Sequence, residues 1–411
     1  MTGQRSELIV VIGAGQAGTE LALGLRREGY AGRIVLIGQE PIAPYQRPPL
    51  SKAFLTSPQT EESLWLRAPG AYDKAGIELR LATRVLSVDR AAHVVDLDDG
   101  TQLRYDKLGF ATGGTARQLP GARRARNLHS LRTMADAVAL RSRLVQGRRL
   151  IVIGGGFVGL EIAAAAVARG LSVTVVESQP LLMSRVTSPF IGRHMKEVHT
   201  AHGVDVRTGV GVAELTYGPD GQTVDAATLT DGSHLAADEM VAGIGMNANV
   251  TLAAEAGLAV ADGITVDVHA RTSDPDIVAV GDCATAAHVL LPRPVRLESV
   301  HHATEQARVA AATLCGKSRL YAAVPWFWSD QYGTSLRIAG VIDGCDSSVV
   351  RGDPACGSFS VLHFRGDTLV AVEAVNAAAD FIAGRRLIQQ GAAPDPDSVA
   401  DSKVPLIVGS G

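Results

Sequence analysis

Two glycine-rich segments are the residues of this chain best suited to binding phosphate groups. Each follows an apolar run, at residues 9–12 and 150–153, and each precedes a helix-like stretch. The first glycine allows a tight turn, the second lets the backbone approach a pyrophosphate, and the third lets the helix pack against the strand. The positions are Gly13, Gly15, Ala17 and Gly18 in the first segment and Gly154, Gly155, Gly156, Phe157, Val158 and Gly159 in the second. Two complete segments predict two dinucleotides, and therefore electron transfer between them.

The residue at the tip of the next strand decides how an adenosine ribose is held. In the second segment that residue is Glu177, whose carboxylate accepts from both ribose hydroxyls and repels a 2′-phosphate, so NADH is favoured over NADPH. The first segment has Gly38 at this point, and either Gln39 or Glu40 is its candidate ribose ligand. Arg185 is a rival phosphate ligand or a solvated surface charge.

Two further charged residues have a chemical interpretation. Glu161 is expected on the first turn of the helix after Gly159, where it either positions a nicotinamide carboxamide or is simply an acid at a helix start. Lys52 ends a prolyl turn that begins at Arg47. It is a candidate partner for a flavin ring, which gains negative charge on taking up hydride; the alternative is a surface loop with incidental charges.

These residues need a repeated α/β framework to position them. Each half is predicted to open with strand, helix and strand, then to pass through a β-rich excursion and a returning strand. The predicted elements are Leu8–Ile12, Gln16–Glu28, Arg33–Ile37 and Lys107–Thr112 in the first half, and Leu150–Ile153, Val158–Arg169, Ser172–Val176 and Glu239–Ile244 in the second. Beyond Pro325, short alternating strands and a helix at Ala377–Gln390 predict an α+β domain. The tail Pro394–Gly411 is predicted to be loosely ordered.

Size and composition indicate several globular domains. The chain has 411 residues, of which 46% are hydrophobic and 20% charged, and its net charge is −3. This charge gives no argument for nucleic acid, and no apolar run is long enough to span a membrane. With no signal segment ahead of the first strand, we expect a cytoplasmic protein. The four cysteines show no C-x-x-C spacing, so we expect them to be reduced and mostly buried, with no metal site.

A set of motifs resembles one family over most of the chain, roughly residues 7 to 390. The motifs are Arg47–Lys52, Ala111-Thr112-Gly113, Gly154–Gly159, Thr272–Pro275, Gly281-Asp282-Cys283, Glu298-Ser299-Val300 and Pro325–Gln331, in this order. Their sequence resembles the FAD-dependent, NADH-using ferredoxin reductases of bacterial oxygenase systems. The resemblance implies an α/β fold with two Rossmann-like, glutathione-reductase-like dinucleotide-binding domains and a C-terminal α+β interface domain. The implied boundaries are 1–115 and 248–322 for FAD, 116–247 for NAD and 323–411 for the interface domain.

The resemblance also implies roles for individual residues. The FAD site would include Ala17, Gln39, Glu40, Arg47, Lys52, Val85, Ala111, Thr112, Gly113, Arg132, Asp282 and Val300, with Asp282 on the ribityl chain. The NADH site would include Gly155, Gly156, Phe157, Val158, Glu161, Glu177 and Gly245. Trp328 would lie at the flavin edge that faces the redox partner; the alternative is a core tryptophan. Since hydride transfer needs no acid or base, the catalytic residues Lys52, Glu161 and Trp328 would position and polarise.

Two positions depart from the family pattern. Phe157 stands where tyrosine is frequent, which removes a hydroxyl but keeps an aromatic ring over the flavin. His301 and His302 replace a polar pair at the pyrimidine end of the flavin. Adjacent histidines rarely chelate alone, so a solvent-facing or hydrogen-bonded pair is favoured over a metal site, and His301 is a candidate for tuning the flavin potential.

The cysteine pattern indicates where the electrons go. Disulfide reductases of this fold carry a redox cysteine pair early in the chain, whereas this chain has no cysteine before Cys283. We therefore expect NADH to reduce FAD, and single electrons to leave for an acidic [2Fe–2S] ferredoxin that supplies a cytochrome P450 or a Rieske-type oxygenase. Arg308, Arg385 and Arg386 are candidate steering charges or solvated surface charges.

Other interpretations of the chain stay open. Rubredoxin reductase and monodehydroascorbate reductase share the fold and lack the thiol too. A flavin-binding interaction protein resembling apoptosis-inducing factor is the alternative from another class. The chain is expected to be a monomer or a homodimer.

Overall fold

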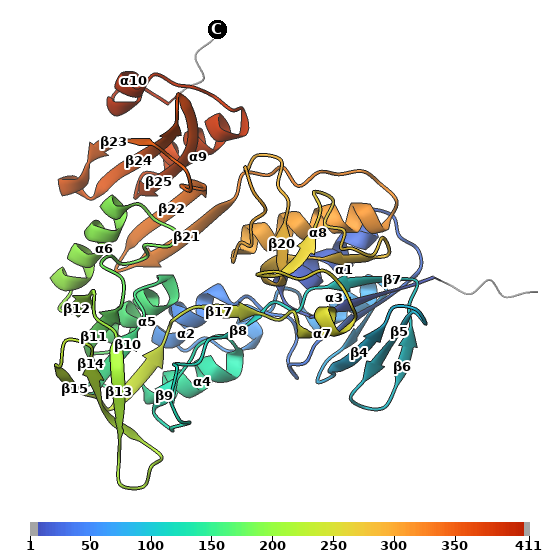
Figure 1. Ribbon diagram of the computed structural model, residues 1–411, viewed down its shortest axis with the longest axis horizontal. Helices are drawn as coiled ribbons and strands as arrows, with labels where there is room; N and C mark the ends of the chain where they lie inside the picture. The colour runs from blue at the N-terminus through green and yellow to red at the C-terminus, as the bar shows by residue number, and fades with distance from the viewer. Residues whose placement is uncertain (1–6, 407–411) are drawn as a thin grey trace, which may run out of the picture. The chain divides into compact units, whose positions relative to one another are not determined.

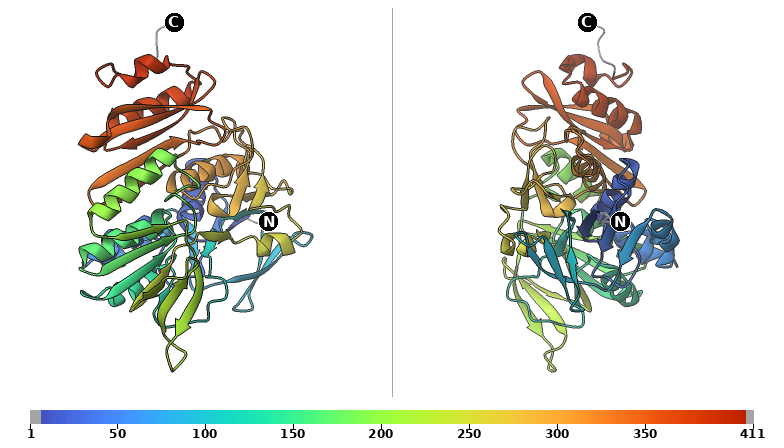
Figure 2. Two further views of the ribbon diagram at one scale, coloured as in Figure 1. Left: turned by 60° about the vertical axis from the view of Figure 1, so that its left-hand side comes forward. Right: turned by 90° about the vertical axis from the view of Figure 1, so that its right-hand side faces the viewer.

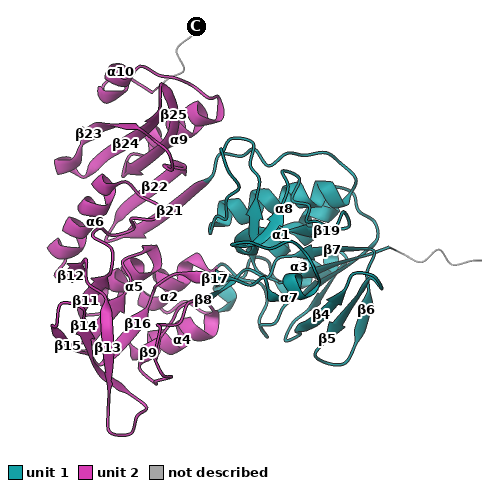
Figure 3. Cartoon of the chain, viewed as in Figure 1, with its two compact units in different colours: residues 1–46, 61–115, 247–325 teal, residues 47–60, 116–246, 326–411 magenta. Residues whose placement is uncertain are grey.

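The computed structural model describes residues 7–406, which form two compact units (Figure 3). The first unit comprises residues 1–46, 61–115 and 247–325, and the second comprises residues 47–60, 116–246 and 326–411. The prolyl turn that carries Lys52 thus clusters with the second unit. The short strands β8 (Gly114–Ala116) and β17 (Met246–Ala248) lie where the chain passes between the units. The three-domain boundaries drawn from the sequence stay a prediction.

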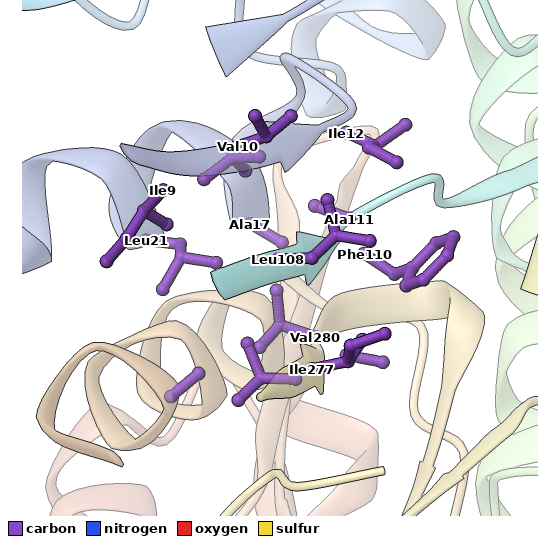
Figure 4. Close-up of a cluster of buried hydrophobic side chains, with 14 of the residues drawn as sticks. Ile9, Val10, Ile12, Ala17, Leu21, Leu108, Phe110, Ala111, Ile277 and Val280 are labelled. Carbon is purple, nitrogen blue, oxygen red and sulfur yellow. The ribbon is translucent and has the colours of Figure 1, made fainter. Parts of the chain in front are cut away.

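The first unit is built on a parallel sheet in the order β19-β7-β1-β2-β3. Its strand β7 is labelled in Figure 1. The strands are β1 (Leu8–Ile12), β2 (Arg33–Ile37), β3 (Ile77–Arg80), β7 (Lys107–Phe110) and β19 (Ile277–Ala279). Strand β1 is apolar at every position and buried at every position, as expected of a central parallel strand covered on both faces. In Figure 4 the side chains of Ile9, Leu108 and Ile277 from three adjacent strands meet Leu21 in one apolar core.

Two long helices of this unit pack side by side. They are α1 (Gln16–Arg27) and α8 (Val300–Leu314). A Cβ at Gly24 of α1 would lie 2.9 Å from the Cβ of Ala311 of α8, so the glycine permits this close approach. The remaining elements are α3 (Pro69–Lys74), α7 (Thr251–Glu255), the 3₁₀ turns η2 (Glu62–Leu64) and η3 (Gly281–Cys283), the antiparallel strands β4 (Val85–Asp89), β5 (Val94–Leu97) and β6 (Gln102–Arg104), and the parallel pair β18 (Ile264–Val266) and β20 (Ala284–Ala286).

The second unit contains another parallel sheet, in the order β12-β11-β10-β16-β9. Its strands are β9 (Leu128–His129), β10 (Arg149–Ile153), β11 (Ser172–Glu177), β12 (Asp205–Thr208) and β16 (Glu239–Ala242). The helices of this part are α2 (Ala53–Thr56), α4 (Met134–Arg143), α5 (Phe157–Ala168) and α6 (Pro189–Ala201), with the 3₁₀ turn η1 (Pro48–Ser51). Strands β13 (Val212–Tyr217), β14 (Val224–Leu229) and β15 (His234–Ala236) form an antiparallel excursion.

The C-terminal part of the second unit is an antiparallel sheet with a helix packed on it (Figure 2). The strand order is β21-β22-β25-β24-β23, and the elements are β21 (Trp326–Gln331), β22 (Thr334–Gly340), β23 (Ser347–Asp353), the 3₁₀ turn η4 (Pro354–Cys356), β24 (Ser358–Arg365), β25 (Thr368–Val375), α9 (Ala378–Gln389) and α10 (Pro396–Ala400). We call the glycine-rich segments 13–18 and 154–159 the first and second glycine fingers. Helix α5, which starts in the second finger, also packs against β21, so this finger and the C-terminal sheet are close together. The predicted fold class is confirmed.

Three predictions from the sequence are wrong. Helix α5 begins at Phe157, so Glu161 lies beyond its first turn and does not gain from the helix N-terminus as supposed. Of the cysteines, only Cys283 is buried, because the others lie on or near surface turns. The tail is structured as far as Val404: α10 lies there and the buried Arg351 guanidinium donates to the carbonyls of Val399 and Val404. Residues 407–411 of that prediction lie outside the described residues.

Within residues 7–406, no helix is both long enough and apolar enough to cross a membrane.

Candidate functional site

The first glycine finger has the geometry that a pyrophosphate needs. Gly13 adopts φ +110°, and a Cβ there would lie 2.1 Å from the carbonyl oxygen of Ala111. A Cβ at Gly18 would lie 1.8 Å from the Gly13 carbonyl oxygen, so helix α1 packs closely on its own turn. A Cβ at Gly15 would meet no described atom within 4 Å, and no described side chain caps this helix start. The turn thus leaves an open, uncapped helix N-terminus, which fits a bound phosphate.

The other residues predicted to hold FAD in the first unit converge on the same sheet edge. Strand β19 leads into η3, where a Cβ at Gly281 would lie 2.8 Å from the Cβ of Ala17. Val300 begins helix α8, whose residue Gln306 accepts a hydrogen bond from the Gly281 amide (2.7 Å). Asp282 is partly exposed beside them. The carboxyl ends of parallel strands are where ligands bind in such folds, so this grouping is the candidate FAD site.

The tip of β2 differs from the acidic pattern for a steric reason. A Cβ at Gly38 would lie 2.8 Å from the Cβ of Ala14, so a larger residue would press on the phosphate turn. Gln39 is exposed, whereas the Glu40 carboxylate accepts from the Tyr45 hydroxyl (2.7 Å). Because Glu40 already has this partner, Gln39 is the more available of the two candidate ribose ligands.

The remaining predicted FAD residues divide between the two units. Val85 is buried at the start of β4, in the first unit, with Thr112 and Gly113 on the segment after β7. Arg47 lies in the second unit and donates to the carbonyl of Arg132 (2.5 Å). Assignment of these residues to the cofactor stays a prediction.

The second glycine finger repeats the first in the second unit. Gly154 adopts φ +106°, and a Cβ there would lie 2.5 Å from the Gly243 carbonyl oxygen. A Cβ at Gly159 would lie 2.2 Å from the Gly154 carbonyl oxygen. A Cβ at Gly156 would meet no described atom within 4 Å, and within the described part of the chain no side chain caps helix α5. This turn also fits a phosphate on the helix N-terminus.

Acidic and basic groups surround that second turn. The Glu177 carboxylate accepts from the amide of Gly155 (2.6 Å) and from that of Gln179 (2.7 Å). Gly245 adopts φ +99°, and a Cβ there would lie 3.4 Å from a terminal nitrogen of Arg185. Arg185 is exposed. The structure therefore brings an acid for the ribose and a cation for phosphate to one loop cluster, together with the exposed Val158.

Glu161 is the centre of a buried polar cluster that joins three segments of the second unit. Its Oε1 lies 2.8 Å from the Lys52 Nζ and accepts from the Ser329 hydroxyl at 2.6 Å. Its Oε2 accepts from the Ser51 hydroxyl at 2.5 Å. The Glu161 side chain is only 3% exposed, whereas that of Lys52 is 20% exposed. A buried carboxylate needs such partners, and here they hold the Lys52 ammonium at the start of α2.

Aromatic rings lie along β21, the strand that carries Ser329. Phe157, the first residue of α5, lies against Phe327 of β21 with ring centroids 4.5 Å apart. Trp328 lies next to Trp326 (5.5 Å between centroids) and is partly exposed, which argues against the core interpretation. The ring of Phe157 is therefore held in place by packing against Phe327, where a tyrosine could also use its hydroxyl.

The histidine pair at 301 and 302 is built into helix α8 of the first unit. His302 is fully buried and its Nδ1 lies 2.6 Å from the Tyr321 hydroxyl. Burial lowers the pKa of His302 to about 4, so its ring is neutral at ordinary pH. The Nε2 of His302 has no hydrogen-bond partner among the described residues.

Sequence reasoning missed the two serines that donate to Glu161, Ser51 and Ser329, and the glutamine that donates to Ser329. Ser51, Ser329 and Gln331 all lie in motifs already singled out, but no role was assigned to them. A strand period of two places Phe327, Ser329 and Gln331 on one face of β21, so this alternation was an available signal.

Comparisons with known proteins identify the family. Residues 8–307 match the family described as pyridine nucleotide-disulphide oxidoreductase, and residues 326–407 match the family described as reductase C-terminal. Putidaredoxin reductase CamA of Pseudomonas putida is 43% identical over 97% of this chain and 95% of its own length. Rhodocoxin reductase of Rhodococcus erythropolis is 44% identical over 97% of this chain and 93% of its own.

A solved structure agrees with these relatives. The covalent putidaredoxin reductase–putidaredoxin complex superposes with a TM-score of 0.95 at 43% identity, covering 97% of both chains. The resemblance inferred from the motifs is confirmed. The chain belongs to the pyridine nucleotide-disulphide oxidoreductase family.

Proposed function

We propose that this chain is an NADH-dependent flavoprotein reductase that passes electrons through FAD to a [2Fe–2S] ferredoxin. Its family and its relatives make it an FAD-dependent oxidoreductase that uses NAD(H). The single observation that carries the proposal is the pair of complete glycine fingers, one in each unit, each ending on an uncapped helix N-terminus. FAD, when bound, takes up a hydride and gives back electrons singly.

Each finger supports one cofactor. We assign FAD to the first, where Gly15, Ala17 and Asp282 lie at one sheet edge. We assign NADH to the second, where the Glu177 carboxylate would accept from the ribose hydroxyls and repel a 2′-phosphate. Lys52 would then polarise the flavin ring, and Glu161 would orient the nicotinamide carboxamide. Neither would act as an acid or a base, because hydride transfer itself needs none. These residue roles are part of the proposal.

The early redox cysteine pair of disulfide reductases has no counterpart in this sequence. The chain has no cysteine before Cys283, and burial raises the pKa of the Cys283 thiol, which keeps it protonated. Two one-electron steps to a carrier therefore fit better than transfer to a disulfide. The proposed carrier supplies a cytochrome P450 or another oxygenase, such as a Rieske-type enzyme.

Each unit by itself carries exposed cations that are candidates for steering an acidic carrier. Arg308 is exposed on α8, where it pairs with Glu305, and Arg385 and Arg386 are exposed on α9. Trp328 is partly exposed on β21. We propose that these cations steer the ferredoxin and that Trp328 contacts it. The cytoplasmic location and the choice between monomer and homodimer stay predictions.

Steady-state and stopped-flow assays of the holoprotein test the proposal. We expect NADH to bleach the flavin and to reduce a [2Fe–2S] ferredoxin faster than rubredoxin or monodehydroascorbate. Flavin reduction slower than about one per second would contradict an enzyme and favour a flavin-binding interaction protein. Activity with rubredoxin but not with ferredoxin would contradict the proposed acceptor.

A further inference from the structure

A buried chain of hydrogen bonds runs from Glu161 to helix α6, away from the glycine finger. The Ser329 hydroxyl contacts Glu161 Oε1, and Gln331 Nε2 donates to that hydroxyl oxygen at 3.0 Å. Gln331 Oε1 lies 2.7 Å from His199 Nε2, and the Tyr332 hydroxyl lies 3.4 Å from His199 Nδ1. All five residues belong to the second unit.

The hydrogen bonds between Glu161 and His199 can run in only one donor-to-acceptor direction. A carboxylate only accepts, so the Ser329 hydroxyl must donate to Glu161. Ser329 then accepts from the Gln331 amide, which leaves the Gln331 oxygen to accept from His199. His199 must therefore carry its proton on Nε2, and its Nδ1 is an acceptor facing Tyr332. Burial lowers the pKa of His199, which agrees with a neutral ring.

The members of the chain are too buried to exchange these partners for water. Ser329, Gln331 and His199 are 1%, 2% and 0% exposed. His199 is a residue of α6, and the strand β21 that carries Ser329 and Gln331 packs against α5. An amide is a poor proton carrier, so the Gln331 link makes the chain unsuited to proton release. Its geometry instead fixes the orientation of the Glu161 carboxylate.

We propose that Ser329, Gln331 and His199 are positioning residues, which hold Glu161 and through it the Lys52 ammonium in the orientation that hydride transfer needs. The inference rests on the proposed function, because Lys52 and Glu161 are assigned to that step. Through Ser329 and Gln331 the C-terminal sheet would contribute to the reduction of the flavin by NADH, in addition to any role in binding the electron acceptor.

A double-mutant cycle tests whether Ser329 acts through Glu161. In the holoprotein at saturating NADH, Ser329→Ala is expected to slow flavin reduction about tenfold, with the Kd of NADH changed less than about twofold. In a Glu161→Gln background the same substitution is expected to change the rate less than about twofold. Ser329→Thr, which keeps the hydroxyl, is expected to restore most of the rate. An equal slowing in both backgrounds, or no slowing in the wild type, would overturn the proposal.

Ser360→Ala is the matched control. Ser360 is also fully buried in the C-terminal sheet, and its hydroxyl also donates to a carboxylate, that of Asp380 (2.8 Å). It lies outside the Glu161 chain, so its removal should lower stability without slowing flavin reduction. A slowing equal to that of Ser329→Ala would show that any buried serine of this sheet matters, and would overturn the proposal.

The protonation of His199 gives a readout that does not depend on turnover. Nitrogen-15 spectra of the histidine side chains, assigned with His199→Asn, should show a protonated Nε2 and an unprotonated Nδ1 at neutral pH. Gln331→Leu should alter the His199 signals, because it removes the acceptor of that proton. A proton on Nδ1 would overturn the proposal even if the Ser329 variants failed to fold. Absence of flavin reduction by NADH in the wild type would instead contradict the proposed function.

Discussion

Glu177 accepts a hydrogen bond from the backbone amide of Gly155, with 2.6 Å between Oε2 and the nitrogen. The strand tip and the glycine turn of the second finger are therefore tied by a charge-assisted bond. The first finger has no carboxylate at this position, because Gly38 packs against Ala14. The two fingers share a backbone plan but differ in how the strand tip is fixed.

This bond leads to a prediction about coenzyme choice. Glu177→Ala removes both the ribose acceptor and the support of the Gly155 amide, so the KM for NADH should rise about tenfold or more, with a smaller change in kcat. The ratio of kcat/KM for NADPH over NADH should rise as well, since the repulsion of a 2′-phosphate is lost. Steady-state kinetics with both coenzymes measure it. Glu214→Ala, on the exposed face of β13, is the control and should keep the wild-type preference.

The Lys52–Glu161 ion pair predicts an effect on flavin reduction alone. Lys52→Met removes the cation but leaves Ser51 and Ser329 as donors to Glu161, so the fold should persist. Because the lysine is expected to stabilise charge that develops on the flavin, NADH should reduce the flavin about tenfold more slowly. Stopped-flow bleaching measures this rate. An unchanged rate with a normal flavin spectrum would show that Lys52 plays only a structural part.

For Trp328 we expect an effect on electron transfer to the ferredoxin and not on flavin reduction by NADH. It is partly exposed on β21 and packs beside Trp326. If it contacts the acceptor, Trp328→Ala should lower kcat/KM for the ferredoxin about tenfold while flavin reduction by NADH stays within about twofold of the wild type. Arg308→Glu should weaken the salt dependence of ferredoxin reduction. A Trp328 variant impaired only with NADH would refute the docking role.

The glycine fingers could be predicted from the sequence, because their signal is local. Gly13 and Gly154 need positive φ and close backbone contacts within a short βα turn, and the sequence records both requirements. Helix α6 was missed although Ser188, its N-cap, precedes Pro189 at its first turn, a pattern typical of a helix start. The signal was present there but was not used.

The Glu161 cluster had no such local signal. Ser329 and Glu161 are 168 positions apart, and their hydrogen bond exists only because β21 packs against α5. The polar, proline-bearing tail was likewise judged by its own composition. What orders it is Arg351, a residue of another strand, whose buried side chain replaces water for several backbone carbonyls. Long-range pairing of this kind cannot be predicted from one segment alone.

The tail itself offers a further prediction. Arg351 is 4% exposed; it pairs with Asp380 and donates to backbone carbonyls from Val399 to Val404. Arg351→Met should release the segment around α10, so residues 396–404 should lose hydrogen-exchange protection and be cleaved faster by a protease. NADH-driven flavin reduction should be retained. Unchanged protection would show that contacts other than those of the Arg351 guanidinium hold the tail.

Stability should also depend on His302 in a defined pH range. The pKa of His302 in the folded protein is lowered to about 4, chiefly by burial. In the unfolded chain this histidine has the ordinary pKa of about 6.5. Between these values the unfolded state binds a proton that the folded state refuses. The stability is therefore fully present above about pH 6.5 and is lost as the pH falls toward 4, by on the order of 3 kcal/mol.

His302→Asn should flatten the fall of the unfolding temperature between pH 6.5 and 4, because no proton is then taken up at this position. Tyr321→Phe is the informative control. It removes the hydroxyl 2.6 Å from Nδ1 but leaves the ring buried, so it should lower stability by about 1 kcal/mol and keep the wild-type pH dependence. Thermal unfolding of the three proteins at a series of pH values measures both effects. If His302→Asn kept the full pH dependence, the proton uptake would belong to another buried group, such as His288, whose pKa burial also lowers.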